Sequence, residues 1–327
     1  MQEKIDIIGE NALAGKGISH DDALFVLRLE KRYLSHLLTW TDSIRQTFNG
    51  NKINLCSVVN ARSGGCSEDC SFCSQSVHFN TGIGTYPLLP VEHILKEAIK
   101  AKSSGAAKFC LSTSGNGIGN IRELEKICEV IEKIKRETDI NVCATLGALT
   151  YDEIKSLRKA GLTRFHHNLE TSEAYFPNVC TTHTYQDRID RVKIAKELGL
   201  STCSGGIFGV GETIKDRVDL AFELNELDVD SIPINFLMPI PGTPLEDVPS
   251  LTPAESLKII AMFRLIMPEK EIRVCGGRLT VLRDLHPLIF HAGANGMMIG
   301  NYLTRSGRTS DKDMQMLFDL GLEIATL

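Results

Sequence analysis

The chain has 327 residues, 43% hydrophobic and 24% charged, a composition typical of a globular protein. Its formal net charge of −5 disfavours nucleic acid as the main partner. No apolar run approaches the roughly 18 residues of a membrane helix, and the charged residues 1–6 do not resemble a signal peptide, so we expect a cytoplasmic protein without a membrane partner.

Residues 1–50 are predicted to form an N-terminal helical extension. Ser19 suits an N-cap, and Asp21 and Asp22 follow it in the first turn of the helix. A second apolar helical pattern begins at Leu34 and includes Trp40. We expect this second helix to pack against the main body of the protein.

Residues 51–327 are predicted to form one domain in which short apolar strands alternate with amphipathic helices. Strands are expected at 53–59, 108–112, 141–145, 164–170, 201–208, 231–237, 271–275 and 296–299. Helices are expected at 91–102, 121–135, 151–160, 185–198, 214–227 and 253–267. Gly105, Gly161 and Gly199 stand where C-capping glycines belong. Eight strands with helical crossovers predict a (β/α)8 TIM-type barrel, whose functional groups lie at the C-terminal ends of the strands.

Three cysteines follow the first predicted strand in a C-x3-C-x2-C spacing: Cys66, Cys70 and Cys73. Three thiolates on one short loop can hold three irons of a cubane iron–sulfur cluster and leave the fourth iron open to a small molecule. A closed zinc site or an electron-transfer ferredoxin would use four ligands instead. The spacing therefore favours a cluster that carries out chemistry at the mouth of the barrel.

Seven further cysteines need a separate account, because ten cysteines in an intracellular chain indicate metal rather than disulfides. Three of them fall on predicted strands: Cys110, Cys143 and Cys203. Either buried core thiols or a second metal site would explain these three. Cys56 is expected to pack in the first strand and Cys128 in the core, and Cys180 has no evident role.

The first motif resembles the signature of the radical S-adenosylmethionine (SAM) enzymes, in which an aromatic residue precedes the third cysteine, as Phe72 does here. From residue 50 onward the chain also resembles the biotin synthase family. The segments that carry this resemblance are 65–76 (GCSEDCSFCSQS), 167–172 (HNLETS), 181–188 (TTHTYQDR), 203–213 (CSGGIFGVGET), 233–235 (PIN), 242–244 (GTP), 277–278 (GR) and 292–295 (AGAN).

This resemblance implies a reaction and its cofactors. In that family a [4Fe–4S] cluster and SAM generate 5′-deoxyadenosyl radicals, which abstract two hydrogens in sequence from dethiobiotin. A second, auxiliary iron–sulfur cluster supplies the sulfur of biotin and is consumed. The resemblance also implies a flavodoxin- or ferredoxin-type electron donor, iron–sulfur assembly proteins as partners, and a homodimer.

The resemblance also assigns roles to residues of this chain. The cofactor-binding residues would be Phe72, Ser112, Asn168, Glu170 and Arg188. Among these, Glu170 would accept from the ribose hydroxyls of SAM and Arg188 would pair with its carboxylate, although each taken alone is also consistent with a surface charge. The substrate-binding residues would be His166, Asn168, Asn235, Thr304 and Arg305. The auxiliary cluster would be held by Cys110, Cys143, Cys203 and Arg278.

Three positions depart from the family pattern. Cys275 stands where many members have serine, three residues before Arg278. Because a guanidinium is almost always protonated and is a poor ligand, we expect Cys275 to replace Arg278 and the auxiliary cluster to be of the four-iron type, with [2Fe–2S] as the alternative. His166 replaces an asparagine of the substrate pocket and leaves the exact substrate open. Arg305 replaces the second of two threonines, where it would pair with a carboxylate or remain solvated.

Three other interpretations are left open by the sequence. A cluster-assembly maturase or a methylornithine-type radical enzyme would share the barrel and the first motif, but would not need the additional strand cysteines. An iron–sulfur scaffold or electron carrier would leave Asn168, Glu170 and Arg188 unexplained. A zinc-stabilised barrel hydrolase would contain no iron.

Overall fold

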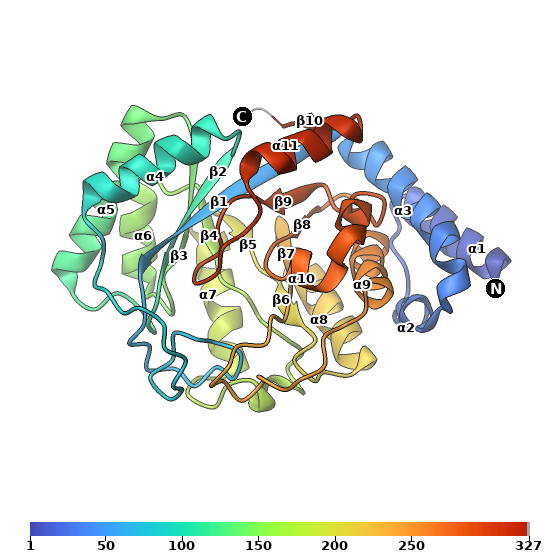
Figure 1. Ribbon diagram of the computed structural model, residues 1–327, viewed down its shortest axis with the longest axis horizontal. Helices are drawn as coiled ribbons and strands as arrows, with labels where there is room; N and C mark the ends of the chain where they lie inside the picture. Colours follow the sequence, from blue (N-terminus) through green and yellow to red (C-terminus); the bar gives the residue numbers. More distant parts are fainter. Residues whose placement is uncertain (326–327) are drawn as a thin grey trace.

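A closed parallel barrel forms the centre of the protein in the computed structural model, which describes residues 1–325 (Figure 1). The strand order around the barrel is β1-β2-β3-β4-β5-β7-β8-β9, and β9 pairs with β1 to close it. β6 continues the position of β5 by pairing with β7, and a short β10 (Glu323–Ile324) pairs with the start of β1. The predicted (β/α)8 barrel is therefore confirmed.

The barrel strands agree with most of the predicted ranges. They are β1 (Lys52–Arg62), β2 (Lys108–Thr113), β3 (Asn141–Thr145), β4 (Arg164–His166), β5 (Ser201–Cys203), β6 (Gly206–Phe208), β7 (Ser231–Phe236), β8 (Glu271–Val274) and β9 (Gly296–Met298). Two predictions were too long: the strand expected at 164–170 ends at His166, and the one expected at 201–208 is divided. The division follows from Gly205, where a Cβ atom would lie 2.1 Å from the carbonyl oxygen of Pro233. Pro233 has no N–H to donate to a neighbouring strand.

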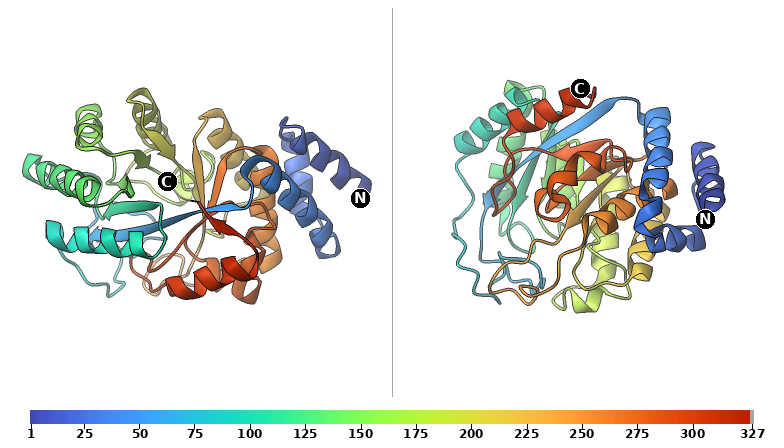
Figure 2. Two further views of the ribbon diagram at one scale, coloured as in Figure 1. Left: turned by 90° about the horizontal axis from the view of Figure 1, so that it is seen from above. Right: turned by 45° about the vertical axis from the view of Figure 1, so that its right-hand side comes forward.

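Helices cover the outside of the barrel (Figure 2). They are α4 (Val91–Ser103), α5 (Ile121–Glu137), α6 (Tyr151–Ala160), α7 (Tyr185–Glu197), α8 (Ile214–Glu226), α9 (Pro253–Ile266), α10 (Arg278–Leu282) and α11 (Ser310–Asp319). Four of them, α6 to α9, begin with a capping box in which a threonine and an acidic residue three positions later satisfy each other's backbone N–H groups. Gly161 ends α6 in a left-handed conformation, as predicted.

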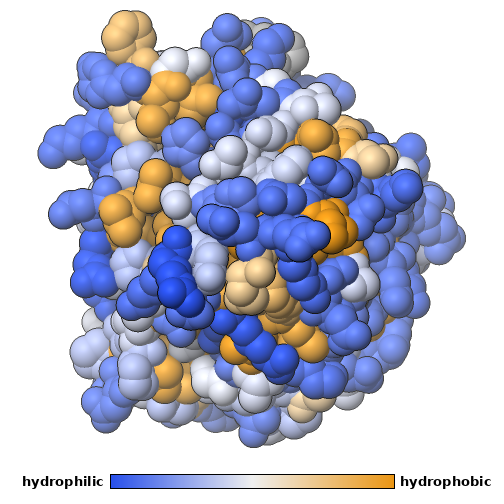
Figure 3. Space-filling view, turned by 90° about the vertical axis from the view of Figure 1, so that its right-hand side faces the viewer, coloured by the Kyte–Doolittle hydropathy of each residue, from blue (hydrophilic) through white to orange (hydrophobic). Residues whose placement is uncertain are grey.

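The N-terminal residues form α1 (Gln2–Leu13), α2 (His20–Arg28) and α3 (Leu34–Asn49), which pack on α9. The Ser19 side chain accepts from the backbone N–H of Asp22, which confirms the predicted N-cap. Because α9 lies between these helices and the barrel, apolar residues such as Met262 and Phe263 are fully buried. The outward face of the N-terminal helices is mostly hydrophilic with small apolar patches (Figure 3). Within residues 1–325, no helix combines the length and apolarity required to cross a bilayer.

Loops that follow the strands gather at one end of the barrel. The segment between β1 and α4 and the segment between β7 and α9 lie side by side there (Figure 1). Gly242 brings them together, because it has φ +84° and a Cβ atom at this position would lie 2.2 Å from the carbonyl oxygen of Asn80. These loops form the end of the barrel at which TIM-type enzymes place their active sites.

Candidate active site

A cavity of about 340 Å³ runs through the barrel interior. It extends from Lys108 and Arg164, at the starts of β2 and β4, to Gln75 and Ile240 in the loops that follow the strands. Most of the residues assigned from the sequence line this cavity. Four do not: Cys66, Cys70, Arg188 and Arg278.

The C-x3-C-x2-C loop lies at the mouth of the cavity. Cys73 and Phe72 line the cavity, while Cys66 and Cys70 are buried behind them. Backbone hydrogen bonds hold the loop in place. The Cys66 N–H donates to the Gln75 carbonyl (3.0 Å), and the Cys73 N–H donates to the Cys70 carbonyl (2.9 Å). Burial raises the pKa of Cys73 to about 11, so binding of a metal would have to displace the thiol proton.

Polar side chains beyond the end of β4 are connected by hydrogen bonds and an ion pair. Asn168 Nδ2 donates to Glu170 (3.2 Å), and Arg188 Nη1 donates to the Asn168 carbonyl (2.9 Å) and lies 3.7 Å from Glu170 Oε1. Asn168 Oδ1 accepts from Gly205 N–H at 3.1 Å. Among residues 1–325, nothing hydrogen-bonds the buried Nε of Arg188, so this group is available to an anion that the protein would bind.

Five thiols meet at the base of the cavity rather than the four predicted. They belong to Cys56, Cys110, Cys143, Cys203 and Cys275. Cys110 and Cys143 are direct neighbours in the register of β2 and β3, and Cys203 Sγ lies 3.3 Å from Nδ1 of His166. Cys56 lies in the first strand, β1, as predicted, and its thiol also faces the cavity next to that of Cys275.

The arginine at this base is Arg273 and not Arg278. Arg273 lines the cavity two residues before Cys275, on the same face of the strand, and its Nε has no hydrogen-bond partner in the described chain. Arg278 begins α10 after Gly277, which has φ +78°, and its guanidinium is bonded to Asp313. The structure therefore corrects the prediction that Arg278 is a candidate ligand.

Charged side chains form a floor beneath the thiols. Glu271 accepts from Arg164 (3.1 Å) and Lys108 (3.3 Å) and is also paired with Arg273. Burial, together with Arg273 and Arg164, lowers the pKa of Lys108 to about 7. The two guanidinium groups against one carboxylate leave an excess of positive charge even where Lys108 is neutral, and this excess favours thiolates and bound sulfide above it.

The remaining predicted residues lie on the cavity wall. Ser112 and Asn235 line its interior, and Thr304 and Arg305 line its outer part. Asn235 is already engaged, since Oδ1 accepts from Gly276 N–H (2.9 Å) and Nδ2 donates to the Gly206 carbonyl (3.2 Å). Thr304 Oγ1 lies 3.2 Å from Ser74 Oγ, which connects the C-terminal loop to the cysteine loop.

Comparisons with known proteins identify the family of the chain. The radical SAM superfamily model matches residues 61–224, and the Biotin and Thiamin Synthesis associated domain matches residues 233–323. The biotin synthase of Geotalea daltonii is 46% identical over 326 residues, which cover 100% of this chain and 99% of that protein. The biotin synthase of Pelotomaculum thermopropionicum is 48% identical over 311 residues, which cover 95% of this chain and 97% of that protein.

Solved structures share the fold at low identity. A methylornithine synthase superposes with a TM-score of 0.86 at 21% identity, covering 97% of each chain. A maturase of the [FeFe]-hydrogenase superposes with a TM-score of 0.84 at 18% identity, covering 98% of this chain and 75% of that one. At these identities the likeness shows the barrel architecture alone.

Proposed function

This chain belongs to the biotin synthase family of radical SAM enzymes, and on that premise we propose how its residues divide between two clusters and the substrate. It is a sulfurtransferase whose reaction inserts sulfur into dethiobiotin to give biotin. The observation that carries our assignment is the convergence of five thiols and the Arg273 side chain on one cavity below a separate three-cysteine loop.

Cys66, Cys70 and Cys73 would hold the radical-generating cluster. Such a [4Fe–4S] cluster would supply the single electron for reductive cleavage of bound SAM to a 5′-deoxyadenosyl radical. Arg188 suits the SAM carboxylate because its Nε is buried without a partner in residues 1–325. Glu170 would accept from the ribose hydroxyls, since its carboxylate lines the cavity and is held by Asn168.

The thiols at the base would hold the auxiliary cluster, for which we favour a four-iron type. A four-iron cluster ordinarily takes four cysteines, and the cavity offers Cys110, Cys143 and Cys203 with both Cys56 and Cys275. Arg273 would contribute charge rather than a metal bond, because a guanidinium stays protonated. The [2Fe–2S] alternative would instead use three of these thiols and Arg273.

The substrate would lie between the two cluster sites. His166 would donate a hydrogen bond to the ureido carbonyl of dethiobiotin, and Arg305 would pair with its carboxylate. Oδ1 of Asn168 and of Asn235 accepts from a backbone N–H, and Nδ2 of each already donates one N–H, so each amide would offer its second N–H. Apolar walls that include Phe72 and Ile207 would exclude water from the reacting carbon atoms.

The first experiment is anaerobic turnover with dethiobiotin, SAM and a strong reductant, with biotin and 5′-deoxyadenosine measured by mass spectrometry and iron and sulfide counted per chain. Biotin with about eight irons per chain would support two four-iron clusters, and biotin with about six would favour the [2Fe–2S] alternative. Deoxyadenosine without biotin would contradict the substrate assignment, and His166 would then be the first residue to replace.

Iron counts on variants test the ligand assignment directly. Because either Cys56 or Cys275 could serve as the fourth thiol, we expect the double variant Cys56→Ala/Cys275→Ala to change the iron or sulfide content of the auxiliary cluster while the radical cluster stays intact. Cys128→Ala is the matched control, because Cys128 lies on α5 away from both sites. An unchanged auxiliary cluster in the double variant would show that Cys110, Cys143 and Cys203 suffice and would contradict the four-iron assignment.

A further inference from the structure

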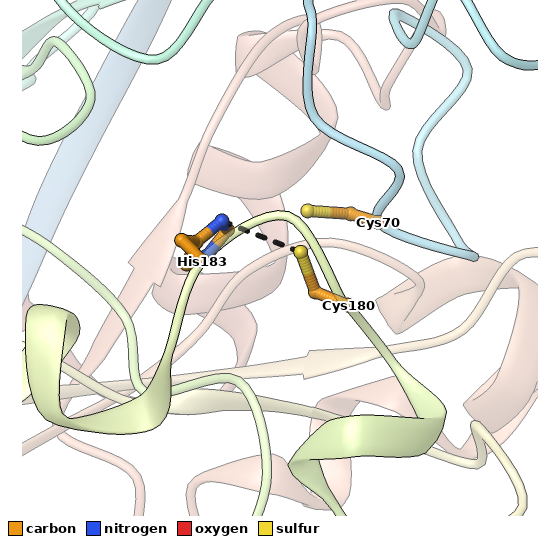
Figure 4. A group of neighbouring side chains, drawn as sticks. All are labelled: Cys70, Cys180 and His183. Carbon is orange, nitrogen blue, oxygen red and sulfur yellow. Dashed lines mark hydrogen bonds between the residues drawn. The ribbon is translucent and has the colours of Figure 1, made fainter.

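A third group of metal-binding side chains lies beside the radical-cluster loop. The sulfur atoms of Cys70 and Cys180 and a ring nitrogen of His183 all lie within 4.8 Å of one another. Figure 4 shows Cys180 and His183 facing each other on one segment, with Cys70 directed toward them from the neighbouring loop. Cys180 Sγ lies 3.3 Å from His183 Nδ1. The assignment of the two clusters leaves Cys180 and His183 without a role.

The spacing of these atoms suits one tetrahedral ion. Zinc binds sulfur at about 2.3 Å and imidazole nitrogen at about 2.0–2.1 Å, which places tetrahedral donor atoms about 3.5–3.8 Å apart. The three donor atoms lie within 4.8 Å of one another, so they would need to approach by only about 1 Å to bind one ion. Thiolate and imidazole together favour zinc and similar divalent transition ions over calcium or magnesium.

Two carboxylates are in place to complete the coordination. Asp69 Oδ1 lies 3.1 Å from Cys180 Sγ, and Glu68 is hydrogen-bonded to His183 Nδ1. The side chains of Glu68 and His183 are only 10% and 14% exposed, so the group is shielded from bulk water. A backbone hydrogen bond joins the segment of Cys70 to the segment of Cys180, since the Ser71 N–H donates to the Val179 carbonyl at 2.8 Å.

We propose that the chain without its radical cluster binds one divalent transition ion, for which Zn²⁺ is the probe, at Cys70, Cys180 and His183, with Glu68 or Asp69 as the fourth ligand. This ion and the radical cluster exclude each other, because both need the Cys70 thiolate. The exclusion rests on the proposed role of Cys70 in the cluster, whereas ion binding itself does not. Occupation of the site would therefore control whether the cluster assembles.

Zinc binding to the reduced, cluster-free, full-length chain tests the site without any turnover. Native mass spectrometry would count zinc ions per chain, and competition with a chromophoric chelator would give their affinities. We expect Cys180→Ala and His183→Gln each to remove one tightly bound zinc or weaken it at least 10-fold. The double variant should lose the same single ion. Zinc bound by the barrel thiols should be the same in the variants and in the unmodified chain, so it does not affect the difference in zinc count between them.

The matched control is Cys128→Ala, which removes a thiol outside the group and should bind as many zinc ions as the unmodified chain. Circular dichroism would establish that each variant is folded. Zinc number and affinity unchanged in both Cys180→Ala and His183→Gln would overturn the proposed site.

The exclusion has its own readout. After preloading with zinc, the unmodified chain should rebuild the radical cluster slowly, as followed by iron content and visible absorption, and Cys180→Ala should rebuild it faster. If the variants lose the zinc ion but rebuild the cluster no faster, the ion site stands and the exclusion is overturned. Absence of biotin formation would bear on the proposed function alone.

Discussion

Arg278 Nη2 donates to Asp313 Oδ2 at 2.8 Å, and the two side chains are 1% and 0% exposed. This ion pair joins α10 to α11 and lies beneath the loop that carries Tyr302. Arg308 approaches the other carboxylate oxygen at 3.4 Å. The pair therefore fixes the C-terminal segment against the barrel, which is a structural task rather than a metal-binding one.

Replacing Arg278 should cost stability and leave cluster content unchanged. Arg278→Met would bury the Asp313 carboxylate with only Arg308 nearby, and breaking such a buried pair costs about 3–5 kcal/mol. Urea denaturation of the cluster-free chain would measure the loss. Arg32→Met is the control, because the ion pair of Arg32 with Glu30 is exposed to solvent and should contribute little to stability. A stable Arg278→Met protein that lacks auxiliary iron would restore Arg278 as a ligand.

Glu170 adopts a left-handed conformation with φ +72°, which is unfavourable for a residue with a Cβ atom. Glu170→Gly should relieve this strain and raise stability by about 1 kcal/mol or less, because glycine also has more freedom to lose on folding. The same change should weaken SAM binding about 10-fold or more, since hydrogen bonds to a charged group are worth about 1.5–3 kcal/mol. Calorimetric titration would measure the affinity.

The control for this substitution is Asp228→Gly, at another left-handed position with φ +49° outside the cavity. It should relieve similar strain, lose only exposed ion pairs with Lys196 and Lys270, and leave SAM binding unchanged. Equal SAM affinity in Glu170→Gly and the unmodified chain would remove Glu170 from the cofactor site.

The part of the site carried by local spacing could be predicted from the sequence. Cys66, Cys70 and Cys73 lie on one loop, and alternation along neighbouring strands brings Cys110 and Cys143 together. The position of the Cys56 thiol in the cavity could not be predicted. Alternation defines two faces of β1, and only closure of the barrel by β9 decides which face is inside. The same strand periodicity favours Arg273, two residues before Cys275, but the resemblance had drawn attention to Arg278 instead.

Gly205 shows where prediction of the strands failed. The apolar pattern of residues 201–208 extends through it, but its approach to Pro233 depends on a neighbour distant in sequence. Gly205→Ala should therefore destabilise the protein by about 1–3 kcal/mol or more through overpacking, and disturb Asn168, whose Oδ1 accepts from Gly205 N–H. Thermal unfolding would measure the loss. Gly84→Ala, where a Cβ atom meets nothing within 4 Å, should be nearly neutral.

Acid should weaken the protein partly through His286. Burial and the neighbouring Arg278 lower the pKa of this imidazole from 6.5 to about 4, so the folded state favours the neutral form. Between these two pKa values the imidazole of the unfolded chain is protonated more than that of the folded chain. The free energy of unfolding that His286 contributes at neutral pH is therefore lost as the pH falls from about 6.5 to about 4.

We expect His286→Gln to reduce the difference in unfolding free energy between pH 7 and pH 5 by about 1 kcal/mol, a value discounted for the partial exposure of the ring. Urea denaturation of the cluster-free chain at the two pH values would measure it. His93→Gln, at an exposed histidine on α4, should leave the difference as it is in the unmodified chain. If both variants keep the full pH dependence, the loss must come from other buried groups such as His167, whose pKa burial also lowers.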